Sequence, residues 1–162
     1  MANTLVTRRL IMVQLAVEEA VALVDGRGGS GRTWAPGYPD DGALMAAGFV
    51  MTAAKHGRDL GPFGTYEIIR RRDGAVIGAA GFQGPPDEIG AVRVGYGLAE
   101  SARGHGYATE ALSRLLEWAR DQEGLTCVLA DTTRTNVASQ HVMERSGMHR
   151  IGEDGELLYY MA

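Results

Sequence analysis

At residues 103–108 the chain reads Arg103-Gly104-His105-Gly106-Tyr107-Ala108, between a strand-like run at 92–98 and a helix-like run at 108–120. The two glycines remove side chains where the backbone must approach something closely, and the first N–H groups of the helix point into the same loop. Such a loop is suited to phosphate. It lacks the Gly-Lys-Ser/Thr of the P-loop and the third glycine of the dinucleotide-binding fingerprint, so it is neither of these two nucleotide-binding loops. Ordinary loop chemistry in a chain of 23 glycines is the alternative.

The helix after this loop has one apolar face. Its apolar residues fall at helical spacing: Ala108, Ala111, Leu112, Leu115, Leu116 and Ala119. We expect this face to be buried, because an apolar stripe of that period packs on a core. The buried face would anchor the loop.

The remaining chain mixes strand-like and helix-like runs. We expect strands at 5–15, 65–71, 75–82, 91–98, 126–132, 148–151 and 156–161, and helices at 17–24, 40–54 and about 136–145. Asp73-Gly74 predicts a hairpin turn, 26–31 a flexible loop and 152–155 a closing turn. This order predicts one domain over residues 1–162, a mixed α/β sandwich without regular alternation.

Composition narrows the functional class. The chain has 162 residues, 45% apolar, and a net charge of −4, which disfavours a nucleic-acid-binding surface and favours cationic partners such as amines. The single cysteine, Cys127, lies in an apolar run, so we interpret it as a core residue and exclude an internal disulfide. No apolar run approaches the roughly 20 residues of a membrane span, so we expect a cytoplasmic protein that does not bind membranes. The four histidines are scattered, and we predict no metal.

Two segments carry a family resemblance. Arg103, Gly106 and Ala108 fit the Arg/Gln-x-x-Gly-x-Gly/Ala pattern, which resembles the pyrophosphate loop of the GNAT superfamily of acyl-CoA-dependent N-acetyltransferases. A second block, with Asn-Val-Ala-Ser at 136–139 and Glu-Arg-Ser-Gly-Met at 144–148, resembles that family's downstream segment. The opening Leu-Val-Thr-Arg-Arg-Leu-Ile at 5–11 is similar to the ribosomal-protein N-terminal (RimJ/RimL-like) branch.

The resemblance implies a single GNAT-type α/β (α+β) domain, with a mixed, mostly antiparallel central sheet flanked by helices. It also implies acetyl-CoA as cofactor. Backbone N–H groups of the loop would bind the diphosphate through Arg103, Gly104, His105, Gly106, Tyr107 and Ala108. The preceding strand would place the pantetheine arm and the thioester through Tyr96, Gly97 and Leu98, although the Tyr96 side chain can simply pack. Asn136 would orient the pantetheine, its alternative role being a helix cap.

The same resemblance suggests the catalytic groups. The ribosomal-protein branch offers a serine as proton donor to the leaving thiolate, here Ser139, whereas Met143 stands where many relatives have a tyrosine. The alternative is that Ser139 bonds only its own helix or the cofactor. Arg93 stands where many relatives have a glutamate, so the general base is left open among four carboxylates: Glu67, Glu88, Glu100 and Asp131.

The predicted function is acetyl transfer from acetyl-CoA to a primary amine, directly and in a ternary complex. The acceptor is a protein N-terminus or a small molecule, and the branch resemblance makes a homodimer plausible. Trp34 and Tyr38 in a proline-stiffened loop are the candidate acceptor residues, with core packing as the alternative. Two alternative functions would use the loop to bind a ligand without transferring an acetyl group: an acyl-CoA-binding sensor and a nucleotide-binding module.

Overall fold

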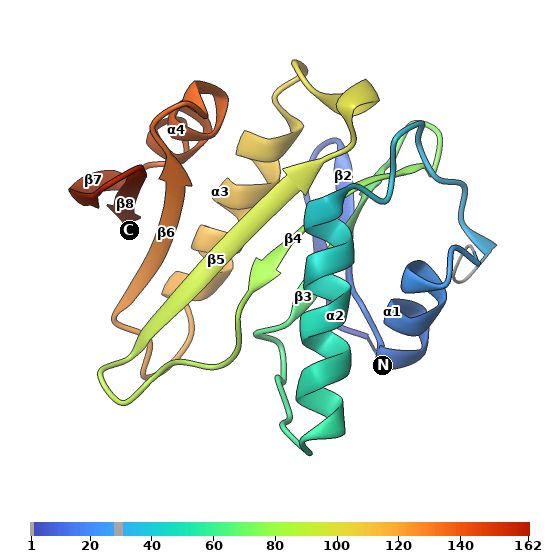
Figure 1. Cartoon of the computed structure of the whole chain (residues 1–162), viewed down its shortest axis with the longest axis horizontal. Helices are drawn as coiled ribbons and strands as arrows, with labels where there is room; N and C mark the ends of the chain where they lie inside the picture. The colour runs from blue at the N-terminus through green and yellow to red at the C-terminus, as the bar shows by residue number, and fades with distance from the viewer. Residues whose placement is uncertain (1, 28–30) are drawn as a thin grey trace.

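The computed structural model describes residues 2–27 and 31–162. These residues form an eight-stranded sheet in the order β1-β2-β3-β4-β5-β6-β8-β7 (Figure 1). The strands are β1 (Thr4–Val6), β2 (Leu10–Gln14), β3 (Thr65–Arg70), β4 (Val76–Phe82), β5 (Ala91–Leu98), β6 (Cys127–Thr133), β7 (His149–Asp154) and β8 (Leu157–Met161). The helices are α1 (Val17–Val24), α2 (Asp41–Lys55), α3 (Tyr107–Arg120) and α4 (Val137–Arg145), with a short 3-10 turn, η2 (Glu100–Ala102). The expected mixed, mostly antiparallel sheet flanked by helices is confirmed.

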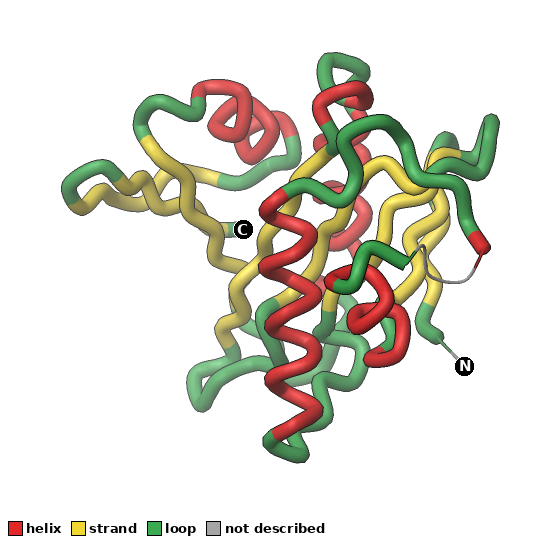
Figure 2. Tube along the Cα trace, turned by 45° about the vertical axis from the view of Figure 1, so that its right-hand side comes forward, coloured by secondary structure: helices red, strands yellow, loops and turns green. Residues whose placement is uncertain are grey.

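The sheet separates two layers of helices. α1 and α2 cover one face, whereas α3 covers the other, with α4 beside it over the C-terminal strands (Figures 1 and 2). The larger core cluster lies on the α3 face, and the predicted apolar stripe of α3 is buried in it: Ala111, Leu112, Leu115, Leu116 and Ala119. A second cluster lies beneath α1 and α2. Burial of the stripe fixes α3, and therefore the loop before it, on the sheet.

Between residues 17 and 145 the expected elements are present, with their bounds shifted by at most one residue. Part of the loop expected at 26–31 lies outside the described residues, at 28–30. The strand expected at 5–15 is wrong, because this segment is the antiparallel hairpin of β1 and β2. The chain turns at residues 7–9: the Thr7 N–H donates to the Leu10 carbonyl (3.0 Å) and the Thr7 hydroxyl accepts from the Leu10 N–H (2.9 Å). Threonine stabilises turns in this way.

The turn expected at 152–155 is also placed wrongly. β7 continues to Asp154, and the chain turns at Gly155 and Glu156. The register between β7 and β8 shifts between Arg150 and Gly152, so Gly152 belongs to a bulge inside the strand. In the sheet, β8 lies between β6 and β7.

β5 and β6 are neighbours in the sheet over only part of their length. They pair in parallel over Ala91–Arg93 and Cys127–Leu129. Beyond this point β5 continues with β4 as far as Leu98, whereas β6 pairs with β8 as far as Thr133. The two strands diverge toward the end at which β5 enters η2 and α3 (Figure 1). A gap therefore opens beside the second half of β5.

The N-terminal turn is fastened to the start of α3. Glu110, in the first turn of α3, accepts hydrogen bonds from the Thr7 hydroxyl (2.5 Å), the Arg9 backbone N–H (2.8 Å) and Arg9 Nε (2.6 Å). Arg9 Nη1 also donates to the His105 carbonyl (2.8 Å), and its guanidinium lies 4.6 Å from the centre of the Tyr107 ring. One arginine thus holds both the glycine loop and the helix that follows it.

These contacts change the acidity of Glu110. Partial burial would raise the pKa of this carboxyl, but the hydrogen bonds from Thr7 and Arg9 and the charge of Arg9 outweigh burial and lower it. A carboxyl with a lowered pKa in the folded state contributes stability above its unfolded pKa of about 4.3. That contribution is lost as the pH falls through the folded pKa.

We expect Glu110→Gln to lower the free energy of unfolding at pH 7 by about 1 to 3 kcal/mol, because hydrogen bonds to a charged acceptor contribute about this much. The difference from wild type should shrink below about pH 4, where protonation removes the same charge from the wild type. Urea denaturation at about pH 7 and pH 3.5 measures both effects. Glu117→Gln, on the exposed side of the same helix, is the matched control. Equal stability of Glu110→Gln and wild type at pH 7 would contradict the assignment.

Candidate active site

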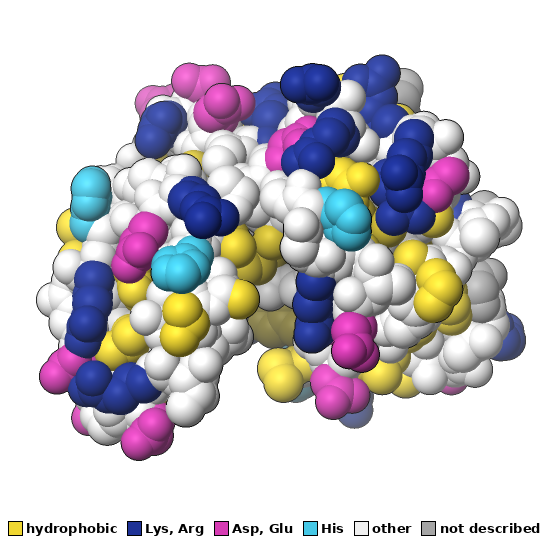
Figure 3. Space-filling model, turned by 90° about the horizontal axis from the view of Figure 1, so that it is seen from above, with side chains coloured by type: hydrophobic (Ala, Val, Ile, Leu, Met, Phe, Trp, Pro, Cys, Tyr) yellow, Lys and Arg dark blue, Asp and Glu magenta, His cyan; other side chains and the backbone are white. Residues whose placement is uncertain are grey.

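The second half of β5 presents a backbone edge to the gap. Just after the strand, the Ala99 N–H donates to the Ile77 carbonyl (2.8 Å), on the β4 side. Because backbone groups alternate in direction along a strand, those of Gly97 also face β4, whereas those of Tyr96 and Leu98 face the gap. Seen from above, the surface is hollowed between the C-terminal part, with β6–β8 and α4, and the rest of the molecule (Figure 3). Two of the three predicted strand residues thus direct backbone groups to this hollow: Tyr96 its N–H and carbonyl, and Leu98 its N–H.

The glycine loop follows directly from this edge. Gly104 and Gly106 both have positive φ, 80° and 78°, which glycine adopts without strain. Gly106 is the N-cap of α3, so no side chain caps this helix, whereas Asp40 caps α2 and Asn136 caps α4. Among the described residues, a Cβ at Gly104 would meet nothing within 4 Å, and one at Gly106 only Arg9 Nη2, at 3.4 Å. The open loop and the free N–H groups of α3 fit a diphosphate.

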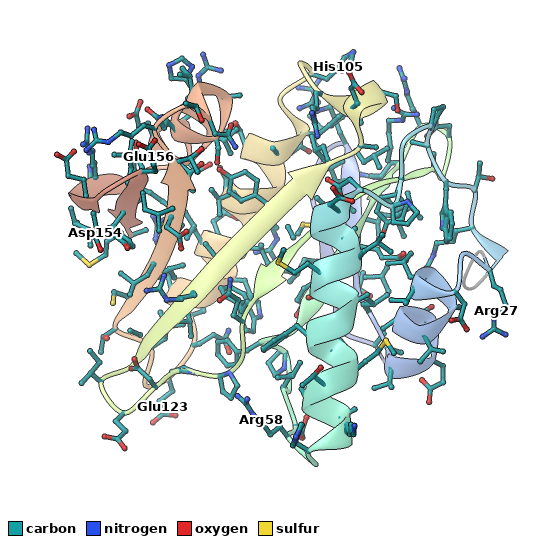
Figure 4. The ribbon with its side chains drawn as sticks, in the orientation of Figure 1. Arg27, Arg58, His105, Glu123, Asp154 and Glu156 are labelled. Atoms are coloured by element: carbon teal, nitrogen blue, oxygen red, sulfur yellow. The ribbon has the colours of Figure 1, made fainter. Side chains whose placement is uncertain are left out.

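The side chains of the loop lie in different surroundings. Arg103 folds back on the strand, since its Nε donates to the Leu98 carbonyl (3.1 Å). His105 is exposed at the end of the molecule where β5 stops, as labelled in Figure 4, and its ring stacks on Tyr107 at 5.8 Å. Tyr107 is buried in the core, so only its backbone can serve a ligand in the gap. Ala108 is half-buried and packs against the same core.

The first turn of α4 closes the other side of the gap. Asn136 is the helix cap, because its Oδ1 accepts from the Ser139 N–H (3.1 Å). The Ser139 hydroxyl lies 2.8 Å from the Tyr96 hydroxyl, and the latter also donates to the Ser139 carbonyl (3.0 Å). Burial raises the pKa of Tyr96 to about 12, although the hydrogen bond with Ser139 opposes this effect. A neutral hydroxyl pair therefore connects β5 with α4, a contact that the sequence alone did not reveal.

A cavity of about 390 Å³ lies on the α2 face of the sheet. No charged side chain is among its lining residues, which are Gly42, Met45, Ala46 and Phe49 of α2, Thr65 of β3, residues 79–83 of and just after β4, and residues 95–97 of β5. Tyr96 belongs both to this lining and to the strand edge at the gap, and Gly97 follows it in the lining. The cavity therefore meets the gap at the end of β5.

Small residues make room for this cavity. Side chains alternate between the faces of a sheet, and the α3 face of β5 carries Val94, Tyr96 and Leu98. On the α2 face, Gly97 lies opposite Ala79, and Gly95 lies opposite Gly81. The floor beneath α2 is therefore largely bare backbone and methyl groups.

The structure separates the four carboxylates that the sequence left open as general base. Asp131 pairs with Arg93 at 3.1 Å, so the arginine at the usual glutamate position is neutralised by the neighbouring strand. Glu88 and Glu100 are exposed, in a loop and in η2. Glu67 is buried on the α2 face. It pairs with Ala79 of β4, which in turn pairs with Gly97 of β5, so the three residues lie in one row across the sheet.

Glu67 already has two partners. Its carboxylate accepts from the Tyr38 hydroxyl (3.1 Å) and from Arg32 Nη1 (2.9 Å). Burial raises the pKa of Glu67, although both partners favour its charged form. Burial also raises the pKa of Tyr38, and the nearby Glu67 charge adds to this effect. This network ties the loop before α2 to the sheet.

The two candidate acceptor residues lie in that same loop. Tyr38 is 6% exposed, and its ring meets Trp34 edge-on at 5.8 Å. Trp34 is half-buried and bridges to Val76 of β4. Both residues belong to the second core cluster or pack against it, and neither lines the cavity. Their contact with an acceptor stays a prediction.

One residue beside the site was not singled out from the sequence. Asp40, the N-cap of α2, places Oδ2 3.1 Å from the position that a Cβ on Gly97 would occupy. An aspartate just before a helical pattern signals a cap. Only the pairing of β4 with β5 and the docking of α2 bring it to Gly97.

Within residues 2–27 and 31–162, no three His, Cys, Asp or Glu side chains are grouped as metal ligands would be. The helices in these ranges are too short or too polar to cross a membrane.

Comparisons with known proteins identify the family. Residues 9–149 match the acetyltransferase (GNAT) domain model. The uncharacterized N-acetyltransferase YjdG of Bacillus subtilis is 30% identical over 100 residues, a match that spans 60% of this chain and 60% of that relative.

Solved structures share the fold over nearly the whole chain. An acetyltransferase from Agrobacterium tumefaciens is 25% identical with a TM-score of 0.67, over 99% of this chain and 94% of that one. A ribosomal L7/L12 alpha-N-protein acetyltransferase in complex with coenzyme A is 16% identical with a TM-score of 0.70, over 99% and 97%. The chain belongs to the GNAT acetyltransferase family, as the glycine loop and the block at 136–148 indicated.

Proposed function

We propose that this chain, as one domain over residues 1–162, is an acetyl-CoA-dependent N-acetyltransferase that acts on a primary amine by direct transfer in a ternary complex. One observation carries the proposal. The free edge of β5 leads through the short turn η2 into a glycine loop and an α3 start that lacks a side-chain cap. This order of donors suits an amide-bearing arm followed by a diphosphate.

Bound acetyl-CoA would supply the activated acetyl thioester. The N–H groups of the loop and of the first turn of α3 would hold the diphosphate, and Arg9 would keep them in place through Glu110 and His105. The backbone of Tyr96 and Leu98 would align the pantetheine arm. The Nδ2 group of Asn136 would contact that arm, because Oδ1 is engaged in the cap.

The leaving thiolate requires a proton, which we assign to Ser139. Its hydroxyl is held by Tyr96 at 2.8 Å, at the α4 side of the gap. A tyrosine whose phenol stays protonated at neutral pH can return a proton to the serine oxygen. Tyr96 therefore supports Ser139 as part of one proton path.

The acceptor is proposed to be a protein N-terminus or a small primary amine, with Trp34 and Tyr38 shaping its approach. The fold shared with a ribosomal-protein acetyltransferase supports the N-terminus as one candidate. We propose a cytoplasmic location, since acetyl-CoA is available in the cytoplasm. A homodimer also remains part of the proposal.

We expect release of CoA thiol from acetyl-CoA to depend on an added primary amine. Thiol detection across short peptides, amino acids and alkylamines, with a protein-only blank for Cys127, measures this activity. Calorimetry with acetyl-CoA alone runs in parallel. Tight acetyl-CoA binding without release for any amine would favour a sensor over a transferase.

Gly106→Val should weaken acetyl-CoA binding by about 100-fold or more, because a branched side chain at positive φ both strains the loop and covers its N–H groups. Gly124→Val is the matched control, since Gly124 has almost the same φ, 79°, in the turn that follows α3. Calorimetric measurement of acetyl-CoA affinity in both variants separates an effect on the binding loop from a general effect of backbone strain. Equal affinity of Gly106→Val and wild type would remove the loop from the cofactor site.

Ser139→Ala should lower kcat by about 100-fold or more while the acetyl-CoA affinity changes little, as expected for loss of a general acid. Tyr96→Phe should lower kcat by a smaller factor, because Ser139 keeps its own proton. Ser113→Ala, at a serine in the middle of α3, is the control. Steady-state kinetics and calorimetry measure the two quantities, and an unchanged kcat in Ser139→Ala would exclude this role.

A further inference from the structure

We infer that Asp40 binds the ammonium group of the acceptor and takes its proton, and that the cavity beneath α2 receives an uncharged, apolar body of that acceptor. The inference rests on the proposed transferase function and names its substrate class. The juxtaposition of Asp40, Gly97 and an uncharged cavity is its basis.

Asp40 is held firmly, with one oxygen to spare. Oδ1 accepts from the Ala43 N–H (2.9 Å) as the cap of α2. Oδ2 lies beside Gly97, 3.1 Å from where a Cβ there would stand, and both oxygens lie 3.8 Å from the corresponding position on Gly42. Gly42 and Gly97 both line the cavity. The carboxylate therefore lies beside two residues that line the cavity, without itself belonging to the lining, and close to the strand edge that would hold the thioester.

In the described part of the chain, no cation neutralises the Asp40 carboxylate. Among residues 2–27 and 31–162, Asp40 has no ion-pair partner within 4.0 Å, whereas Glu67 pairs with Arg32 and Asp131 pairs with Arg93. Asp40 is also half-buried, so its charge is less screened by water than that of an exposed acid. An ammonium group is the complementary ligand, and it can donate to Oδ2 with a charge-assisted hydrogen bond.

The cavity restricts the group to which the amine is attached. Its lining includes Met45, Phe49 and Phe82, together with small residues, and it carries no charge. Burial of a second ammonium group without a partner is costly. The geometry therefore selects a primary amine on an apolar body over polyamines and aminoglycosides.

The proposed reaction conserves protons and bonds. The acceptor ammonium gives one proton to Asp40, which passes it to water, and the resulting amine forms the N–C bond to the acetyl carbonyl as the C–S bond breaks. CoA departs as the thiol with a proton from Ser139, and the second proton leaves the nitrogen through water and restores the Ser139 hydroxyl by way of Tyr96. Overall, one ammonium and one acetyl thioester yield one amide, one thiol and one released proton.

Asp40→Asn is the decisive variant, because asparagine caps a helix as well as aspartate does and only the charge is lost. Asp41→Asn is the matched control, since Asp41 is exposed in the first turn of the same helix. We expect Asp40→Asn to lower kcat/KM for hexylamine by about 10- to 100-fold, the effect of losing a charge-assisted hydrogen bond. The acetyl-CoA affinity and the unfolding midpoint should stay those of Asp41→Asn.

A matched pair of acceptors tests the cavity. Hexylamine and 1,6-diaminohexane have the same length, but the diamine would bring a second charge into the apolar lining. We expect wild type to prefer hexylamine by about 10-fold or more in kcat/KM. Equal use of both amines would overturn the substrate class.

Binding separates this inference from the proposed function. Hexylamine is titrated calorimetrically into the protein–CoA complex of wild type, Asp40→Asn and Asp41→Asn. Binding that is lost only in Asp40→Asn supports the ammonium site, and if turnover is absent in that case, the transferase proposal alone fails. Binding or turnover that is equal in Asp40→Asn and Asp41→Asn overturns the role of Asp40, and so does absence of hexylamine binding to wild type.

Discussion

The structure depends on where β5 loses its parallel neighbour. A strand in a sheet has two hydrogen-bonding edges, and β5 keeps both only as far as Arg93, where its pairing with Leu129 ends. Beyond that point β6 is committed to β8, and the β5 backbone groups on this edge, apart from the Leu98 carbonyl bound by Arg103, must bond to water or to a ligand. An extended chain with amide groups can take the place of the missing strand. The ligand would thus complete the sheet in addition to filling a space.

The second constraint is a long-range attachment. Arg9 and Glu110 are 101 positions apart in the chain, and their contact closes a large loop. The N-terminal hairpin would therefore form part of the proposed phosphate site, although its sequence carries no loop motif. Ordering of the glycine loop is coupled to docking of this hairpin, because Arg9 bonds to the loop carbonyl at His105 as well as to the helix.

Local patterns predicted the parts of the site that are local. The glycine loop, the apolar stripe of α3 and the cap at Asn136 each follow from a few adjacent residues, and the structure contains all three. The contact between Tyr96 and Ser139 joins elements 43 positions apart, and the position of Asp40 beside Gly97 depends on helix docking. No periodicity encodes such distances. The hairpin at residues 4–14 was missed because its turn, Thr7-Arg8-Arg9, contains no glycine, proline, asparagine or aspartate to signal it.

The glycine floor beneath α2 has a consequence for how new acceptor preferences can arise. A side chain at Gly81 would collide with the Gly64 carbonyl at 2.3 Å, and one at Gly97 would press on Asp40. A Cβ at Gly95 would meet only the end of Gln83, at 4.0 Å, and Gly95 faces away from the α3 core. A substitution at Gly95 therefore offers a way to shorten the cavity proposed for the acceptor while the core, the loop and the strand edge stay as they are. Divergence of substrate range within one backbone can begin at that position.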